Sequence, residues 1–275
     1  MYSRVYVEIT NVCNMNCSFC HGHSRKPGMM NEETFAHILS QLSEKTKYIY
    51  YHLMGEPLLH PDLPRFITMA KQAGFLSIIT TNGTLLSKRQ QELIHAAPHK
   101  FNISLHSFEE GKESDFENYV NQAAAFADAA NAAGIIINFR LWNKGCDGGR
   151  NDQILQILRQ KLSGEWAENT RGYRIREKLY LEWGDRFTWP DKAAPVQSET
   201  VFCHGMRDHF GILCDGTVVP CCLDSDGVIN LGNALQQNIS EILSSPRATA
   251  MVQGFERRTP SEDLCRRCAY AQRFS

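Results

Sequence analysis

Three cysteines stand close together near the start of the chain, directly after an apolar run at residues 5–10 that is typical of a β-strand. They follow a Cys-x3-Cys-x2-Cys spacing and are Cys13, Cys17 and Cys20. Three thiolates on one loop can hold three irons of a four-iron cluster and leave the fourth iron without a protein ligand. A zinc site is the alternative, because His21 or His23 would complete a tetrahedral set of ligands. The spacing therefore predicts a metal centre that follows the first strand.

The size and charge of the chain narrow the class of protein. Its 275 residues, 43% of them hydrophobic, give room for one large α/β domain and a small appendage. A formal net charge of −1 provides no field that favours nucleic acid or an acidic membrane, and the basic residues within 171–178 are typical of a solvated face. No apolar run approaches the ~20 residues that span a bilayer, and no signal peptide precedes the first strand. We therefore expect the protein to be in a reducing cytoplasm, where its ten cysteines are more suited to binding metal than to forming disulfides.

Strand-like and helix-like segments alternate over residues 1–165. The expected strands are 5–10, 48–53, 75–81, 101–105 and 135–141, with a sixth at 179–183. The expected helices are 31–42 with Asn31 as N-cap, 61–73, 87–97 with Ser87 as N-cap, 115–133 and 152–162. An open doubly wound sheet and a curved, partly closed barrel both fit this order. We favour the barrel, a partial (βα)6 TIM-like fold, because chemistry-bearing residues follow several different strands.

The C-terminal part of the chain has a different character. Residues 186–200 contain two prolines and little periodicity, so we expect a linker or lid there. It would join a first domain at 1–185 to a small cysteine-rich module at 201–275.

The cysteine loop, with Phe19 just before its third cysteine, resembles the cluster motif of the radical SAM superfamily. Four more motifs of that family stand at the ends of successive expected strands: Met54-Gly55-Glu56-Pro57, Thr81-Asn82-Gly83, Ile103-Ser104-Leu105 and Asn138-Phe139-Arg140. The resemblance covers roughly residues 4–185 and implies a partial barrel. It also implies a 4Fe–4S cluster on the three cysteines, whose open iron chelates S-adenosylmethionine. Reductive cleavage of that cofactor yields a 5′-deoxyadenosyl radical, which abstracts hydrogen from a substrate.

The resemblance further implies a set of cofactor-binding residues, Phe19, Gly55, Glu56, Asn82, Ser104 and Arg140. The backbone of Phe19 would contact the adenine, while Gly55 and Glu56 would face the methionine amino group. Ser104 would bond the ribose, and its alternative is a plain strand hydroxyl. Arg140 would pair with the methionine carboxylate, with an ordinary ion pair at a strand end as the alternative.

Two residues are candidate catalytic groups. His106 occupies a position where many relatives carry Asp, so we expect it to face the active-site mouth and to orient substrate or titrate near neutral pH. Cys146 lies in the loop after the fifth expected strand. Its thiol could donate hydrogen to a substrate radical, as epimerising members of the superfamily require; the alternative is a small, semi-buried residue.

The second module resembles the SPASM or Twitch domains that bind auxiliary clusters in many radical SAM enzymes. Its expected ligands for one auxiliary 4Fe–4S cluster are Cys203, Cys221, Cys265 and Cys268. Asp215-Gly216 is a turn signal for a hairpin that would bring these cysteines together. Cys222 could replace Cys221 as the ligand, and a zinc ribbon is the alternative for the whole module.

These features predict a radical SAM enzyme. We expect its substrate to be a peptide or protein that undergoes modification, epimerisation or maturation, because an incomplete barrel leaves a wide lateral opening. A small molecule, such as an aminocyclitol, a nucleotide or a cofactor precursor, is the alternative, with dehydrogenation or rearrangement as the reaction. A non-catalytic iron–sulfur or zinc protein is the competing class. An external electron donor such as flavodoxin or ferredoxin is the expected partner, and neither a membrane nor nucleic acid is expected.

Overall fold

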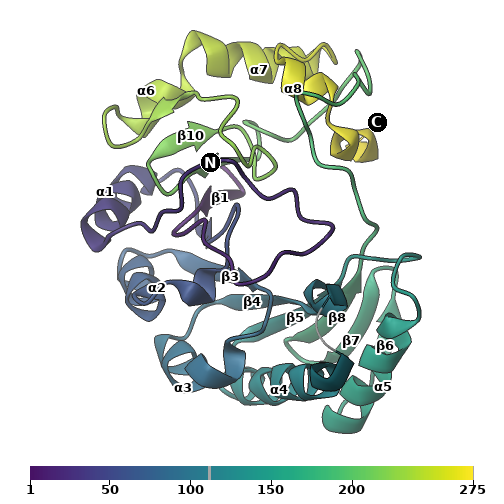
Figure 1. Ribbon diagram of the computed structural model, residues 1–275. Coiled ribbons are helices and arrows are strands. Elements are labelled where there is room, and N and C mark those ends of the chain that lie inside the picture. Colours follow the sequence, from purple (N-terminus) through teal and green to yellow (C-terminus); the bar gives the residue numbers. More distant parts are fainter. Residues whose placement is uncertain (111–112, 275) are drawn as a thin grey trace.

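The computed structural model describes residues 1–110 and 113–274 and has a curved sheet with helices on its outer face (Figure 1). Six parallel strands form the central part, in the order β1 (Arg4–Val7), β2 (Tyr48–Tyr50), β3 (Leu76–Thr81), β4 (Lys100–Ser104), β5 (Ile136–Leu141) and β8 (Leu179–Trp183). The connecting helices are α1 (Glu32–Leu42), α2 (Leu63–Gln72), α3 (Leu86–Ala96), α4 (Glu113–Ala132) and α5 (Arg150–Lys161). The partial (βα)6 barrel expected from the sequence is confirmed.

Of the two N-caps predicted from the sequence, one is correct and one is wrong. Asn31 caps α1, and its side-chain oxygen accepts a hydrogen bond from the Thr34 amide at 2.8 Å. Ser87 was expected to cap α3, but that helix begins one residue earlier, at Leu86. The Ser87 hydroxyl instead donates to the side chain of Gln122 in α4 at 2.8 Å, so it ties two neighbouring helices together.

The sheet continues beyond both edges of the barrel in the described chain. Beside β1 it adds β9 (His209–Ile212), β10 (Thr217–Val219) and β11 (Gly232–Asn233), and beside β8 it adds β7 (Gly172–Arg176) and β6 (Ala167–Asn169). Strand β9 pairs in parallel with β1, with Val5 opposite Phe210. The C-terminal module is therefore joined to the barrel through a shared sheet, whereas the sequence suggested a separate appendage.

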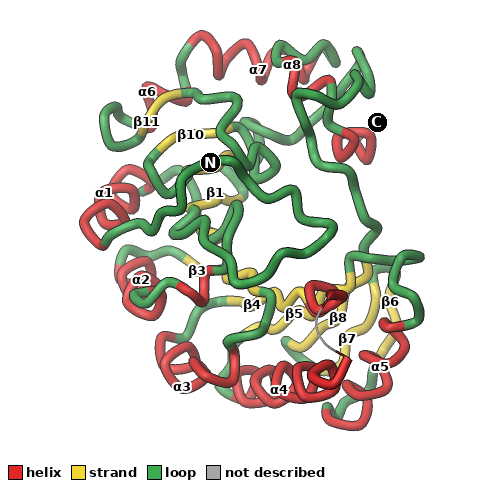
Figure 2. Tube along the Cα trace, viewed as in Figure 1, coloured by secondary structure: helices red, strands yellow, loops and turns green. Residues whose placement is uncertain are grey.

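The remaining C-terminal residues form short helices over this extension. They are α6 (Ile239–Leu243), α7 (Pro246–Glu256) and α8 (Asp263–Arg266), followed by a 3-10 segment, η3 (Ala269–Phe274). Residues 186–200 contain neither helix nor strand, as Figure 2 shows, and run from β8 to the module. No helix in the described residues combines the length and the apolar character that crossing a lipid bilayer requires.

The two faces of the barrel sheet differ in chemistry. Paired residues of neighbouring strands share a face, and successive residues alternate between faces. On the outer face, Val5, Ile49 and Phe101 are fully buried in one hydrophobic core with the helices. On the inner face, Asn102 of β4 lies opposite Asn138 of β5. We call this inner side of the sheet the lumen; it carries polar residues such as Asn102 and Asn138 beside apolar ones such as Ile78.

Candidate functional site

The three N-terminal cysteines lie on the loop that follows β1, at the carboxyl end of the barrel strands. They line a single pocket of about 290 Å³, together with Met54 and Gly55 from the loop after β2. Three thiols on the wall of one pocket fit a cluster with an open iron. Of the two histidines considered as a fourth ligand, His23 also lines this pocket, and His21 stacks on Trp189 with ring centres 6.1 Å apart.

Gly55 permits two loops to cross closely. Its φ of +77° and its position would place a Cβ atom only 2.4 Å from the carbonyl oxygen of Thr10. The next residue, Glu56, donates its backbone N–H to the carbonyl of Val12 at 2.9 Å. Glycine is thus needed to hold the loop after β2 against the cysteine loop, whether or not it also admits a cofactor amino group.

Glu56 braces the ends of two strands. Its carboxyl oxygens accept hydrogen bonds from the Thr81 hydroxyl and the Asn82 amide at 2.7 Å each. The Asn82 side chain in turn donates to Asn14 in the cysteine loop at 2.9 Å. Burial raises the pKa of Glu56 to about 7, although these hydrogen bonds oppose the shift. The sequence missed this bracing role, because the motif pointed to the cofactor.

Arg140 and Ser104 stand opposite each other at the ends of β5 and β4. The Arg140 guanidinium lies 4.5 Å from the centre of the Trp142 ring, and its Nε atom is buried without a hydrogen-bond partner in the described residues. No ion pair joins Arg140 to a described carboxylate, which speaks against the ordinary ion pair considered above. A ligand carboxylate would satisfy this cation.

His106 lies beside this arginine. Its Nδ1 atom donates to the carbonyl of Arg140 at 3.0 Å, and its ring packs on Phe19 with centres 4.9 Å apart. Burial lowers the pKa of His106 to about 4, and the nearby arginines add to the effect. The lowered pKa speaks against titration of His106 near neutral pH, and its role in orienting substrate stays a prediction.

The lowered pKa values of three inward-facing histidines lead us to expect that acid destabilises the folded protein. Burial lowers the pKa to about 3 in His52 and to about 4 in His106 and His209. In the unfolded chain these histidines take up protons near pH 6.5, whereas in the folded protein they stay neutral until about pH 4. The free energy of unfolding therefore falls as the pH drops from 6.5 towards 4, by up to about 1.4 kcal/mol per pH unit for each residue. Melting temperatures measured between pH 7 and pH 5 should be less pH-dependent in His106→Asn. The exposed His95→Asn is the control, and equal slopes in both variants would contradict the assignment.

The C-terminal cysteines meet in a second cavity of about 30 Å³, lined by Cys203, Cys221, Cys265 and Cys268. Burial, with the neighbouring thiols, raises the pKa of Cys221 and Cys265 well above the usual range. Thiols in this state must lose their protons when iron binds. Cys222 does not line the cavity; its thiol lies against the Tyr6 hydroxyl on the lumen side. Four thiols that line one cavity are the donor set of an auxiliary cluster, and Cys221, which lines it, fits better than Cys222 as the fourth ligand.

This placement gives a direct prediction. Cys221→Ala should retain about half of the roughly eight irons expected for two four-iron clusters, whereas Cys222→Ala should retain nearly all. Iron and sulfide analysis after anaerobic reconstitution, with EPR of the reduced protein, measures both. Loss of iron in Cys222→Ala with full iron in Cys221→Ala would reverse the assignment.

Cys146 is exposed in the loop after β5. It lines neither the pocket of the N-terminal cysteines nor the second cavity. Its role as a hydrogen donor stays a prediction from the sequence.

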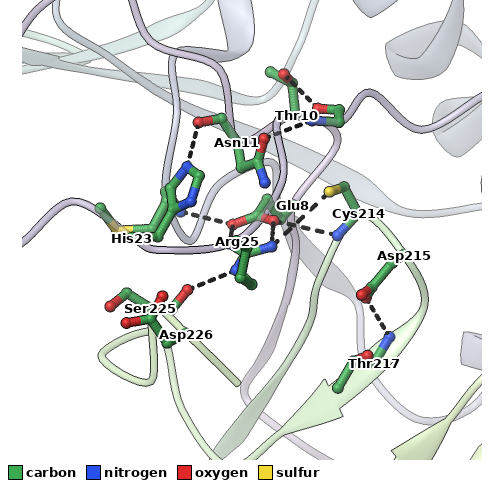
Figure 3. A network of polar contacts seen from close by, with 12 residues as sticks. Glu8, Thr10, Asn11, His23, Arg25, Cys214, Asp215, Thr217, Ser225 and Asp226 are labelled. Carbon is green, nitrogen blue, oxygen red and sulfur yellow. Dashed lines mark hydrogen bonds and ion pairs between the residues drawn. The ribbon is translucent and has the colours of Figure 1, made fainter. Parts of the chain in front are cut away.

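A buried ion pair holds the cysteine loop to the C-terminal module (Figure 3). The carboxylate of Glu8 in the loop after β1 is fully buried and accepts two hydrogen bonds from Arg25, at 2.8 and 2.7 Å. Arg25 also donates through Nε to the carbonyl of Ser225 at 2.8 Å, and Glu8 accepts from the Cys214 amide at 3.2 Å. This Glu8–Arg25 network was not recognised in the sequence, because its partners are about 200 positions away.

The linker lies over the other side of the cysteine loop. The indole of Trp189 donates to the carbonyl of Phe19 at 3.0 Å. Arg273 of η3 donates to the carbonyls of Asp185 and Arg186. Between these segments lies an open groove of about 830 Å³ that reaches Cys20. Through these hydrogen bonds the linker connects the cysteine loop to the C-terminal residues.

Comparison with known proteins identifies both parts. Residues 7–142 match the model of the radical SAM superfamily, and residues 203–269 match that of SPASM, an iron–sulfur cluster-binding domain. A probable GTP 3′,8-cyclase of Methanococcus maripaludis (strain DSM 14266 / S2 / LL) is 34% identical over 267 residues, which cover 84% of this chain and 88% of that protein. Two further curated relatives, 36% and 34% identical, match over only 24% and 17% of their own length.

Solved structures share the fold. BtrN in complex with AdoMet and 2-DOIA aligns with a TM-score of 0.61 at 21% identity, over 98% of this chain and 93% of BtrN. The native anSMEcpe with bound AdoMet and the Cp18Cys peptide aligns with a TM-score of 0.64 at 10% identity, over 99% and 94%. The two family models, the probable GTP 3′,8-cyclase that aligns over most of this chain, and the two groups of cysteines agree. The chain is an enzyme of the radical SAM superfamily with a SPASM domain, and its cofactors are 4Fe–4S clusters and S-adenosylmethionine.

Proposed function

We propose that this enzyme abstracts a hydrogen atom from a small polar molecule held in the barrel lumen. The observation that carries the proposal is the pocket that Cys13, Cys17 and Cys20 line together at the carboxyl end of the barrel. When bound there, the cluster and S-adenosylmethionine supply the 5′-deoxyadenosyl radical that takes the hydrogen atom. The protein must place the substrate carbon next to this pocket and keep water away from it.

The residues around the pocket have separable roles in this proposal. Arg140 binds the cofactor carboxylate through a guanidinium that has no other carboxylate partner among the described residues. Ser104 and Asn82 contribute hydrogen bonds, and the backbone of Phe19 faces the adenine. Glu56 acts at a distance, because its oxygens are already bonded to Thr81 and Asn82.

The inner face of the barrel favours a compact polar substrate. Asn102 donates to Thr80 at 3.3 Å, and Asn138 donates to Glu182 at 2.7 Å, which forms a polar ladder across four strands. Both asparagine side chains are almost completely buried. A relative aligned over most of its length is named as a probable GTP 3′,8-cyclase, and BtrN was solved with 2-DOIA. This preference departs from the peptide substrate that the sequence suggested.

A peptide remains the second candidate, and the groove beside Cys20 favours it. That groove is open to the surface and is lined by Phe19, Trp189 and Arg273, among others. Aromatic and cationic side chains at a surface groove suit an extended chain. anSMEcpe, which shares the fold, was solved with a peptide.

The test begins with anaerobic reconstitution with iron and sulfide, followed by dithionite and S-adenosylmethionine. We expect 5′-deoxyadenosine, and its absence despite a formed cluster would favour an electron carrier. Cell extract is then divided by size at ~3 kDa and each fraction is added to the reaction. Faster 5′-deoxyadenosine formation with the small fraction supports a small molecule, whereas acceleration by the large fraction alone supports the peptide.

A further inference from the structure

Three cations on the inner face of the barrel form no ion pair among the described residues. They are Arg4, Lys100 and Arg140, and none forms an ion pair with a carboxylate in residues 1–110 or 113–274. The Glu182 carboxylate acts electrostatically on two of them, Lys100 and Arg140, whereas the groups that act on Arg4 are Tyr6, Tyr50 and Cys222. A partly buried cation without a counter-ion is costly, so an excess of positive charge here calls for an anion.

Two of these cations mark the floor of the lumen. Arg4 is the first residue of β1 and Lys100 is the first residue of β4, so both stand at the amino ends of their strands. The pocket of the N-terminal cysteines lies at the opposite, carboxyl ends, where Arg140 also stands. The Arg4 guanidinium lies 5.8 Å from the centre of the Tyr50 ring and is further bordered by Tyr6 and Cys222.

Neutral polar atoms on the same face are also unpartnered. The Nδ1 atoms of His52 and His209 and the Oδ1 atom of Asn138 are buried without a hydrogen-bond partner in the part of the chain that the structure describes. Both histidine rings pack edge-on against Tyr6, with centres 5.6 and 5.7 Å away. Each unpaired buried polar atom destabilises the folded protein, because it has lost its hydrogen bonds to water. Groups of this kind, gathered on one inner face, indicate a site that a ligand completes.

We propose that the lumen binds the substrate through an anionic group, a carboxylate or a phosphate, held at the floor by Arg4 and Lys100. This inference rests on the proposed function and gives it a substrate class and an orientation. The cofactor carboxylate occupies Arg140, and Glu182 offsets one further charge, so the substrate supplies at least one negative charge. Its reacting carbon is then at the end of the molecule remote from the anionic group, towards the cysteine pocket.

The test uses simple anions as probes of the cluster-loaded protein. Melting temperature is measured with inorganic phosphate, pyrophosphate or malonate, against sodium chloride of equal ionic strength. We expect a rise of about 3 °C at saturating concentrations of the preferred anion, because a ligand that binds only the folded state stabilises it. The phosphate and malonate arms tell the two anion chemistries apart.

Variants locate the site. Arg4→Gln and Lys100→Gln should each abolish the anion-induced rise, while Arg4→Lys keeps part of it. Without added anion, Arg4→Gln should melt no lower than the wild type, since it removes an uncompensated charge. Lys47→Gln, an exposed lysine just before β2, is the matched control and should respond as the wild type does.

Two results would overturn the inference. One is a wild-type protein whose melting temperature no anion raises above the chloride control. The other is a rise that persists undiminished in both Arg4→Gln and Lys100→Gln. Formation of 5′-deoxyadenosine by the same wild-type preparation is measured separately. A protein that forms it without binding anions refutes this inference alone, and one that does not form it refutes the proposed function.

Discussion

The triple variant Cys13→Ala, Cys17→Ala and Cys20→Ala should form no detectable 5′-deoxyadenosine and should keep about half of its iron, close to four of eight atoms per chain. All three thiols belong to one pocket, so their removal leaves no ligand for the first cluster. The four cysteines of the other cavity are untouched and should still assemble their cluster. This is the largest loss of activity that we expect from any change in the chain.

Iron analysis, EPR and chromatography of the quenched reaction measure the outcome. Cys146→Ala is the matched control for iron content, because that exposed cysteine lines neither site. Retention of cofactor cleavage in the triple variant would refute the assignment of the first cluster. Loss of all iron would show instead that the two sites depend on each other for assembly.

Arg25→Met should cause the largest loss of stability, about 3–5 kcal/mol, because it leaves the carboxylate of Glu8 buried without its counter-ion. The Glu8 side chain is 0% exposed, and Arg25 supplies both of its charged contacts. The double variant Glu8→Gln, Arg25→Met should recover part of the loss, since no buried charge is then left alone. The same changes should disturb the EPR signal of the nearby N-terminal cluster.

Denaturant unfolding of the anaerobically loaded protein measures this effect. Arg65→Met is the control, because the Arg65 side chain is 63% exposed and its partner Glu32 is 44% exposed. Exposed pairs of this kind contribute about 0–1 kcal/mol. An equal fall in the free energy of unfolding in Arg25→Met and Arg65→Met would show that the buried network contributes no more than an exposed ion pair.

Much of the barrel could be predicted because its strands and helices are local patterns. Strand β8 was placed at 179–183, and α4 within one or two residues of its ends, since apolar periodicity is readable in a short window. The hairpin of β6 and β7 was missed, because all of β6 is exposed and carries no apolar alternation. The pairing of β9 with β1 was also missed, since no local pattern encodes a contact between residues about 200 positions apart.

The candidate site divides in the same way. That the cysteines gather in two places could be predicted, because thiol spacing within a loop or a hairpin is itself the signal; their role as cluster ligands stays a prediction. The behaviour of Glu56 and His106 could not be predicted, because burial decides a pKa and burial is set by the whole fold. Arg25 looks like an ordinary loop residue in the sequence, and its importance appears only when Glu8 is seen to be enclosed.

The position of β1 between β2 and β9 has a consequence for biosynthesis. Strand β1 acquires its neighbour β2 early in synthesis and its neighbour β9 only after residue 212 has emerged. Such long-range pairing raises the contact order of the chain and slows its folding. During translation one edge of β1 therefore stays unpaired until β9 is made. We expect the N-terminal half to need chaperone protection before iron is delivered.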